Sequence, residues 1–165
     1  MELWDILDEN GIPKGYTHER GKPVKDGDYH LVVGIMVTTP DKRVLLTLRH
    51  PDKHHGNTWE ITGGSVVAGE DSLTAAQREL CEETGICVPK EKLTFCRKYP
   101  GNHALYHLYH VEADISEKDI VLQEGETVDA RLVTADEFKR LTAEGKICPP
   151  IVDRHYNDIL KELET

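Results

Sequence analysis

The chain has 165 residues, with 20 lysines and arginines against 30 aspartates and glutamates, and a formal net charge of −10. This length fits one domain, which buries roughly 70% of the surface that the unfolded chain exposes, and leaves no room for a second catalytic domain. The acidic balance argues against a broad nucleic-acid footprint and against attachment to an anionic membrane. An anionic substrate would have to be met by local positive charge or by metal.

The sequence shows no pattern that is typical of a membrane span or of a secretion signal. It has no apolar run near the ~20 residues that a membrane span requires. Its first residues, MELWDILDEN, lack the basic n-region and the apolar h-region of a secretion signal. We therefore expect a soluble, cytoplasmic protein without a membrane partner.

The first 27 residues are expected to form a hairpin and a linking loop. Two short apolar runs between Leu3 and Tyr16 flank Asn10-Gly11, a dipeptide that favours a hairpin turn because both residues tolerate a positive φ. Polar residues with glycine and proline then indicate a loop over residues 17–28. We place the main domain at residues 28–160.

Strand-like and helical segments alternate after residue 28. Runs rich in β-branched and apolar residues, such as HLVVGIMVT, predict strands. The expected strands are residues 30–38, 43–49, 59–62, 93–98, 104–113 and 130–133, and the expected helices are residues 72–84, 135–143 and 152–163. Asp71 or Ser72 suits the N-cap of the first helix, and Gly85 suits the left-handed residue after its end.

The cysteines show neither a metal-binding nor a disulfide-scaffold pattern. Cys81, Cys87, Cys96 and Cys148 contain no Cys-x-x-Cys pair, and their spacing is irregular. We expect four reduced thiols in a cytosolic chain, with Cys81 as a packing residue rather than a nucleophile.

The most informative segment is GSVVAGEDSLTAAQRELCEETGI. On the expected helix, Glu79, Glu82 and Glu83 share one broad face and can converge on one cation. Carboxylate clusters select Mg²⁺ or Mn²⁺ over zinc, and without metal the like charges would raise at least one carboxyl pKa. The alternative is a solvated glutamate-rich face, but such a face requires neither the preceding glycines nor Glu70 and Arg78 at fixed offsets.

This segment, residues 64–86, resembles the signature of the Nudix hydrolase family at every specified position. The resemblance implies an α/β (α+β) fold, namely an α/β/α sandwich with a mixed, curved sheet, to which this chain adds the N-terminal hairpin. It also implies a diphosphatase: water attacks phosphorus in the diphosphate linkage of a nucleoside diphosphate joined to another moiety, and divalent metal offsets the phosphoryl charge. The partner is then a small-molecule nucleoside diphosphate derivative or another organic diphosphate. Homodimers are common among the resembling proteins, and the oligomeric state stays open.

Matched positions assign the site residues. Glu79, Glu82 and Glu83 are the predicted ligands of Mg²⁺, or of Mn²⁺ in its place. Glu79 and Glu83 are the predicted catalytic residues of the helix, with Glu79 the first choice of general base. The family also takes a carboxylate from a downstream loop, for which we choose Glu124 over Glu126. The competing interpretation of Glu124 is that it belongs to an ordinary acidic surface loop. The identity of the general base stays open between Glu79 and a carboxylate of this loop.

Four signature residues are assigned supporting roles around the metal ligands: Gly64, Glu70, Arg78 and Gly85. Arg78 can pair with Glu82 one helical turn later or with Glu70 in the preceding loop. The second pairing would hold the loop against the helix.

Residues outside the signature could meet the substrate. Arg49 and Lys53 flank the expected catalytic loop, where they either contact non-bridging phosphoryl oxygens or are solvated. Trp59 and Tyr106 either stack a base or are buried in the core. None of these positions selects a particular diphosphate.

Nine histidines invite the alternative of a metal site. His103, His107 and His110 would share a helical face, but their run has the composition of a strand. His107 and His110 would then point to opposite faces, and a three-histidine zinc site is not expected. His54 and His55 could contact a phosphate or be ordinary exposed histidines.

Two rival functions stay open. The leader up to YHLVV resembles that of isopentenyl-diphosphate delta-isomerases, which share the Nudix fold, but the cysteine that they use just before the signature is absent here, where Thr62 stands. A catalytically silent nucleotide-binding Nudix module is the second rival. Three mutually repelling carboxylates argue against it, and we rank hydrolysis above both.

Overall fold

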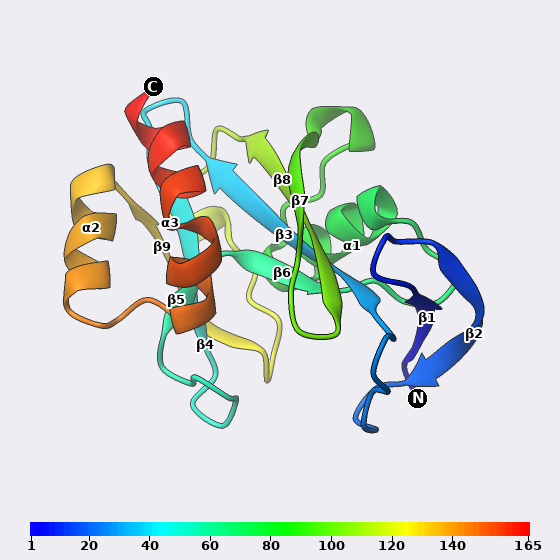
Figure 1. Ribbon diagram of the computed structural model, residues 1–165. Helices are drawn as coiled ribbons and strands as arrows, with labels where there is room; N and C mark the ends of the chain where they lie inside the picture. The colour runs from blue at the N-terminus through cyan, green and yellow to red at the C-terminus, as the bar shows by residue number, and fades with distance from the viewer.

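A mixed sheet organises the chain, and the computed structural model describes residues 1–165 (Figure 1). The strands are β1 (Leu3–Leu7), β2 (Pro13–Glu19), β3 (His30–Thr38), β4 (Val44–Arg49), β5 (Trp59–Glu60), β6 (Thr62–Ser65), β7 (Thr94–Pro100), β8 (Ala104–Glu112) and β9 (Thr127–Val133). The helices are α1 (Ser72–Thr84), α2 (Ala135–Ala143) and α3 (Pro149–Glu164). Strands β1 and β2 form a separate hairpin, and the others form one seven-stranded sheet.

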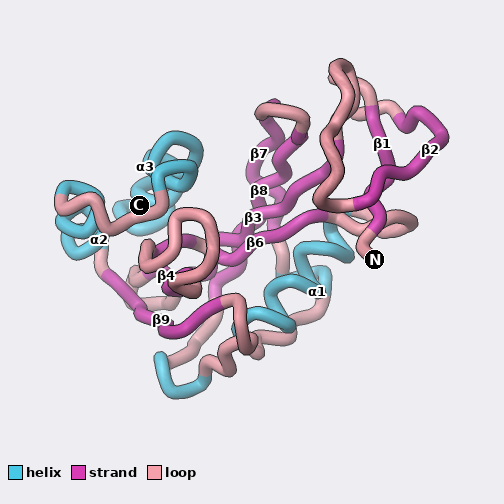
Figure 2. Tube along the Cα trace, turned by 90° about the horizontal axis from the view of Figure 1, so that it is seen from below, coloured by secondary structure: helices cyan, strands magenta, loops and turns pink.

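Strand β3 separates two hydrophobic cores, because alternate side chains of a strand point to opposite faces. Val33 and Ile35 belong to the core that α1 covers with Leu80. Met36 belongs to the core on the other face, together with Phe138 of α2 and Ile159 of α3. Figures 1 and 2 show α1 on one side of the sheet and α2 and α3 on the other. The expected α/β/α sandwich is thereby confirmed.

The sheet splits along one edge of β3. Strand β8 lies parallel to β3 and occupies its other edge from His30 to Thr38. On the split edge, β4 pairs with β3 only at Thr38, whereas β6 pairs with it from Val32 to Ile35. Strands β4 and β6 therefore diverge, and a gap opens between them.

The same split corrects one expected strand. Residues 59–62 were predicted as a single strand, but β5 pairs with β4 and β6 pairs with β3, with Ile61 between them. The backbone groups of β5 form hydrogen bonds with β4, and those of β6 form hydrogen bonds with β3. The two pairings are non-local, and a local pattern does not reveal them.

Helix α1 has the predicted limits because both of its ends are determined locally. The Asp71 side chain accepts a hydrogen bond from the backbone N–H of Thr74 at 2.7 Å, and Gly85 has the left-handed φ of 76°. Helix α2 also has the predicted limits. Helix α3 starts three residues before the expected residue 152, at Pro149, because proline is tolerated in the first helical turn.

The N-terminal hairpin is longer than expected. Residues 17–19 were assigned to the linking loop, but they belong to β2 and pair with residues 3–5 of β1. The hairpin binds the signature loop, because Ala68 N–H donates to the Leu3 carbonyl and Gly69 N–H donates to the Asp5 carboxylate, both at 2.8 Å. None of the helices is both long and apolar enough to cross a membrane.

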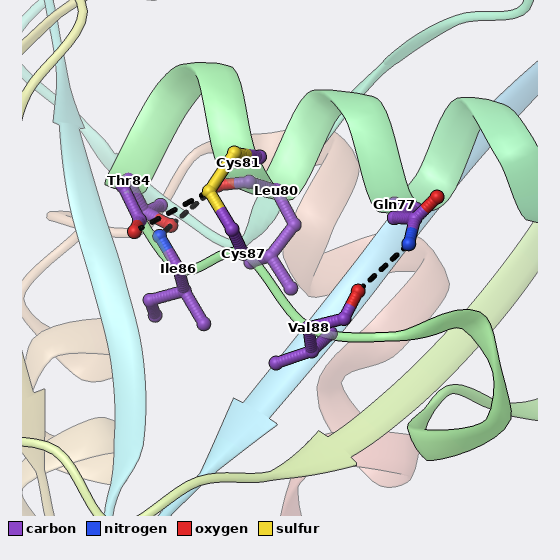
Figure 3. Close-up of a disulfide and its surroundings, with 8 residues drawn as sticks. Gln77, Leu80, Cys81, Thr84, Ile86, Cys87 and Val88 are labelled. Carbon is purple, nitrogen blue, oxygen red and sulfur yellow. Dashed lines mark hydrogen bonds between the residues drawn. A yellow bond between two sulfur atoms is a disulfide. The ribbon is translucent and has the colours of Figure 1, made fainter.

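The expectation of four reduced thiols is wrong for two of them. Cys81 and Cys87 form a disulfide across the end of α1 (Figure 3), with their Cα atoms 4.5 Å apart, and Cys96 and Cys148 are free. The left-handed Gly85 reverses the chain and returns Cys87 to the last helical turn. That separation lies within the range that a disulfide requires.

Candidate active site

A cleft of about 310 Å³ lies at the split in the sheet. Its walls come from β3, β8, the loop after β4, the β5–β6 segment, the end of α1 and the first turns of α3. The charged residues that line it are Arg49, Lys53, Glu60, Glu83 and Arg154. A larger cavity of about 920 Å³ lies between the N-terminal hairpin and β7–β8, and it includes none of these five residues.

Glu83 is the buried acid of this cleft. It lies in the last turn of α1, is only 9% exposed, and accepts no hydrogen bond from another residue. Burial, together with the negative charges of Glu79 and Glu60, raises the pKa of Glu83 to about 8. A carboxylate in such surroundings is satisfied by a proton or by a cation.

Glu79 lies one turn earlier and packs against the backbone of Gly64. A Cβ atom built at residue 64 would overlap the Glu79 carboxylate, so the close approach requires glycine at this position. Burial raises the pKa of Glu79, while Arg78, whose Nη1 is 3.0 Å from Oε1, opposes that rise. The predicted supporting role of Gly64 thus has a steric basis.

Arg78 connects the signature loop to the helix. It pairs with Glu70 at 2.8 Å and with Glu82 at 3.3 Å, so the two alternatives considered from the sequence occur together. Glu70 also accepts a hydrogen bond from the Val67 N–H at 3.2 Å. The loop before α1 is thereby fixed against the face that carries the glutamates.

The three signature glutamates are not equivalent in position. The charge of Glu79 raises the pKa of Glu83, whereas the side chain of Glu82 is 47% exposed and pairs with Arg78. Of the three glutamates, only Glu83 lines the cleft. As the side chains stand, no three histidine, cysteine, aspartate or glutamate side chains converge closely enough to hold a metal ion. The carboxylate oxygens of Glu79 and Glu83 are nevertheless the kind of ligand that Mg²⁺ and Mn²⁺ prefer. The Glu83 carboxylate accepts no hydrogen bond from the protein.

The structure does not bring Glu124 into the site. Glu124 is exposed and forms no ion pair, whereas Glu126 pairs with Lys53 and its charge raises the pKa of Glu83. Glu126 directly precedes β9 and lies beside the cleft through its ion pair with Lys53. The strand was expected to start only at residue 130, so no local signal in the sequence favoured Glu126.

Both predicted cations line the cleft, and each has a carboxylate partner. Arg49 Nη1 lies 2.8 and 3.1 Å from the two oxygens of Glu60, and Lys53 pairs with Glu126. Burial raises the pKa of Glu60, and Arg49 opposes that rise. Glu60 escaped prediction because its pairing with Arg49 depends on the register of β4 with β5.

The two aromatic candidates, Trp59 and Tyr106, lie in different surroundings. Trp59 is 8% exposed and belongs to the core beneath α2 and α3, whereas Tyr106 lines the cleft. His54 and His55 line it as well.

The strand histidines lie on opposite faces, as predicted. His107 contacts Ser72 of α1 at 2.8 Å, and His110 contacts Thr38 at 2.8 Å and Glu162 of α3 at 3.6 Å. The geometry of the strand thus separates their side chains.

Helix α3 contributes two polar cleft residues that sequence reasoning missed, Arg154 and His155. His155 is 4% exposed, and its Nε2 lies 2.7 Å from the Tyr99 hydroxyl. Burial lowers the pKa of His155 to about 4, which keeps the ring neutral near pH 7. No local motif marks either residue, because the packing of α3 on the sheet brings them to the cleft.

The NUDIX domain family profile matches residues 28–150 of this chain, and the chain therefore belongs to the Nudix hydrolase family. Members of this family generally cleave pyrophosphate bonds of nucleoside diphosphate derivatives. The chain is 33% identical over 151 residues to an uncharacterized Nudix hydrolase of Listeria monocytogenes, an alignment that covers 90% of this chain and 89% of that protein. It is also 46% identical over 54 residues to an RNA pyrophosphohydrolase of Caulobacter vibrioides, covering 33% of this chain and 31% of that one.

Solved structures share the fold at low sequence identity. DR0079 of Deinococcus radiodurans superposes with a TM-score of 0.77 at 16% identity, covering 97% of this chain and 98% of that chain. The dihydroneopterin triphosphate pyrophosphohydrolase of E. coli superposes with a TM-score of 0.61 at 22% identity, covering 82% and 97%. Both likenesses concern the fold alone.

Proposed function

We propose that this chain hydrolyses the diphosphate linkage of a nucleoside diphosphate joined to another moiety, in a reaction that requires a divalent cation. The observation that carries this proposal is Glu83, a buried carboxylate in the cleft that accepts no hydrogen bond from the protein and on which the charge of Glu79 acts from one helical turn earlier. A buried acid of this kind is costly without a counter-charge and is typical of functional sites.

Glu79 and Glu83 would hold Mg²⁺, or Mn²⁺ in its place, and Glu82 would complete the set from the same helix. When bound, the cation neutralises phosphoryl charge and helps to activate water. Arg49 and Lys53 line the same cleft and would contact the non-bridging oxygens of the substrate.

The chemistry is one substitution at phosphorus. The oxygen of a water molecule forms a bond to one phosphorus, and the bond from that phosphorus to the bridging oxygen breaks. A carboxylate accepts the proton of the water, and each product carries one of the two phosphoryl groups. We propose Glu79 as this base, with Glu126 rather than Glu124 as the loop carboxylate that could replace it in the role.

The test is phosphate or nucleoside monophosphate release from a nucleotide-diphosphate panel, with and without Mg²⁺. Glu83→Gln should lower kcat by roughly 10²–10³-fold, the range for removing a group that stabilises transition-state charge. Glu79→Gln and Glu126→Gln locate the base, and Glu124→Gln serves as the matched control with near-normal activity. Absence of Mg²⁺-dependent turnover across the whole panel would refute the proposal.

The same preparation tests the rival functions. Turnover of isopentenyl diphosphate would favour the isomerase, although Thr62 stands where that reaction requires a cysteine. Nucleotide binding without turnover would favour a silent module. The proposed cytoplasmic location is checked by cell fractionation, and a homodimer, also a prediction, by light scattering.

A further inference from the structure

The positive charges of the cleft differ in their partners. Arg49 and Lys53 are paired with Glu60 and Glu126. Arg154 lines the same cleft, is half-buried, and forms no ion pair.

A matched comparison comes from the other arginines. Apart from Arg154 and the exposed Arg131, every arginine of the chain pairs with a carboxylate. A guanidinium is always charged, so Arg154 stands in an acidic protein as a half-buried cation without a counter-charge. Such a group is suited to binding an anion.

A series of ring contacts holds the Arg154 guanidinium in place. Its Cζ lies 4.1 Å from the centroid of the Tyr106 ring, and Tyr106 stacks on Tyr99 with centroids 5.1 Å apart and planes 11° from parallel. Arg97, which Asp158 binds at 2.7 Å, lies 4.3 Å from the Tyr99 centroid. The Tyr106 ring, itself stacked on Tyr99, therefore restricts the Arg154 guanidinium, which lowers the cost of ordering it on a ligand.

Arg154 and the signature glutamates approach the cleft from opposite faces of the sheet, because Glu83 comes from α1 and Arg154 from α3. Tyr106 of β8 is paired with Val32 of β3, and Val32 is paired with Ser65 of β6, next to the glycine against which Glu79 packs. A phosphoryl group attacked beside Glu79 and Glu83 therefore lies toward the α1 side of the split, whereas Arg154 offers its guanidinium from the α3 side.

On the basis of the proposed function, we infer that Arg154 is a specificity-determining residue that binds a phosphoryl group additional to the two joined by the scissile bond. The substrate class is then a nucleoside diphosphate derivative with a third phosphoryl group, either farther along the phosphate chain or as a phosphomonoester on one of the moieties. A planar guanidinium binds two phosphoryl oxygens at once, which gives selectivity for such a group.

Kinetics on substrate pairs that differ by one phosphoryl group test the inference: ADP with ATP, NADH with NADPH, and dephospho-coenzyme A with coenzyme A. In a pair that the wild type hydrolyses, the member with the extra group should have the higher kcat/KM. Arg154→Gln should raise KM for that member about tenfold, the effect of losing one charged hydrogen-bonding partner, and leave kcat and the other member nearly unchanged. Arg154→Lys should restore part of the affinity.

The matched control is Arg131→Gln, which removes an exposed arginine that also lies over an aromatic ring, Trp59, but outside the cleft. It should leave both members unchanged. An equal effect of Arg154→Gln on both members, or no effect on either, would overturn the inference. Thermal unfolding of each variant verifies that it is folded.

A second measurement decides the inference without turnover. Inorganic tripolyphosphate is titrated calorimetrically into metal-free wild type, Arg154→Gln and Arg131→Gln. Binding about tenfold weaker in Arg154→Gln alone supports the inference, and equal binding by all three proteins overturns it. If no substrate is hydrolysed, the proposed function fails while this titration still reports on Arg154.

Discussion

Arg78 binds both carboxylate oxygens of Glu70, with Nε 2.8 Å from Oε2 and Nη2 2.9 Å from Oε1. This fork joins the loop before α1 to the middle of the helix, and the Arg78 guanidinium holds the pKa of Glu70 below its usual value. A lysine cannot reproduce a planar, two-bond contact.

Arg78→Lys should therefore lower the free energy of unfolding by about 1–3 kcal/mol, the range for hydrogen bonds to charged groups. Urea unfolding measures the change as a lower midpoint at constant slope. Arg43→Lys, at an exposed pair with Asp41, is the control and should change stability by less than about 1 kcal/mol. Equal midpoints for the two variants would contradict the expected role of the fork.

Gly64→Ala should weaken metal binding. The added Cβ atom would overlap the Glu79 carboxylate and force it away from its position. Displacing such a group is expected to cost roughly 10–100-fold in Mn²⁺ affinity, measured by calorimetry. Gly34→Ala adds the same methyl group where its nearest neighbours are 3.6 Å away, and should bind Mn²⁺ normally.

Cys87→Ser should destabilise the protein only under oxidising conditions. The disulfide closes a short loop, because its cysteines are 6 residues apart, and loop-closure entropy gives it a contribution of about 2 kcal/mol. Thermal unfolding with and without a thiol reductant measures the difference from wild type. Cys96→Ser, at an exposed free cysteine, should match wild type in both conditions. A loss of stability by Cys87→Ser that persists in reductant would show that packing, not the disulfide, is responsible.

Asp28 should make the N-terminal hairpin sensitive to acid. Its carboxylate accepts hydrogen bonds from Lys14 Nζ at 2.8 Å and from the Tyr16 hydroxyl at 2.6 Å, which lower the pKa of Asp28. Because the folded pKa lies below the unfolded value of about 3.9, this stabilisation is present above pH ~4 and is lost as the pH falls through the folded pKa.

Asp28→Asn should thus lower Tm at pH 7 and narrow its gap to wild type as the pH falls toward 3, as scanning calorimetry would report. Asp26→Asn, at an exposed position without an ion pair, serves as the control. A constant gap between Asp28→Asn and wild type from pH 7 to pH 3 would contradict the assignment.

Local patterns predicted the helix that carries the signature. Asp71 and Gly85 determine the ends of α1 through contacts within a few residues, and the helical period then places Glu79 and Glu83 one turn apart. The family resemblance supplied the sandwich around this helix. These parts of the fold require little non-local information.

The remaining features depend on contacts between distant segments. The break at Ile61 arises from competition between β4 and β3 for neighbouring strands. Glu126 rather than Glu124 pairs with the cleft residue Lys53 because it directly precedes β9, and Arg154 reaches the cleft with α3. No spacing rule within one segment encodes such encounters, so these residues could not be selected beforehand.

The parallel register of β3 with β8 pairs His30 with Ala104 and Thr38 with Glu112. The whole signature segment lies inside the chain that this pairing encloses, and closing so long a loop is entropically unfavourable and slow. During synthesis, β3 lacks its neighbour on one edge until β8 has emerged. The cleft can be completed only after β8 and α3, which supply Tyr106 and Arg154, have been synthesised.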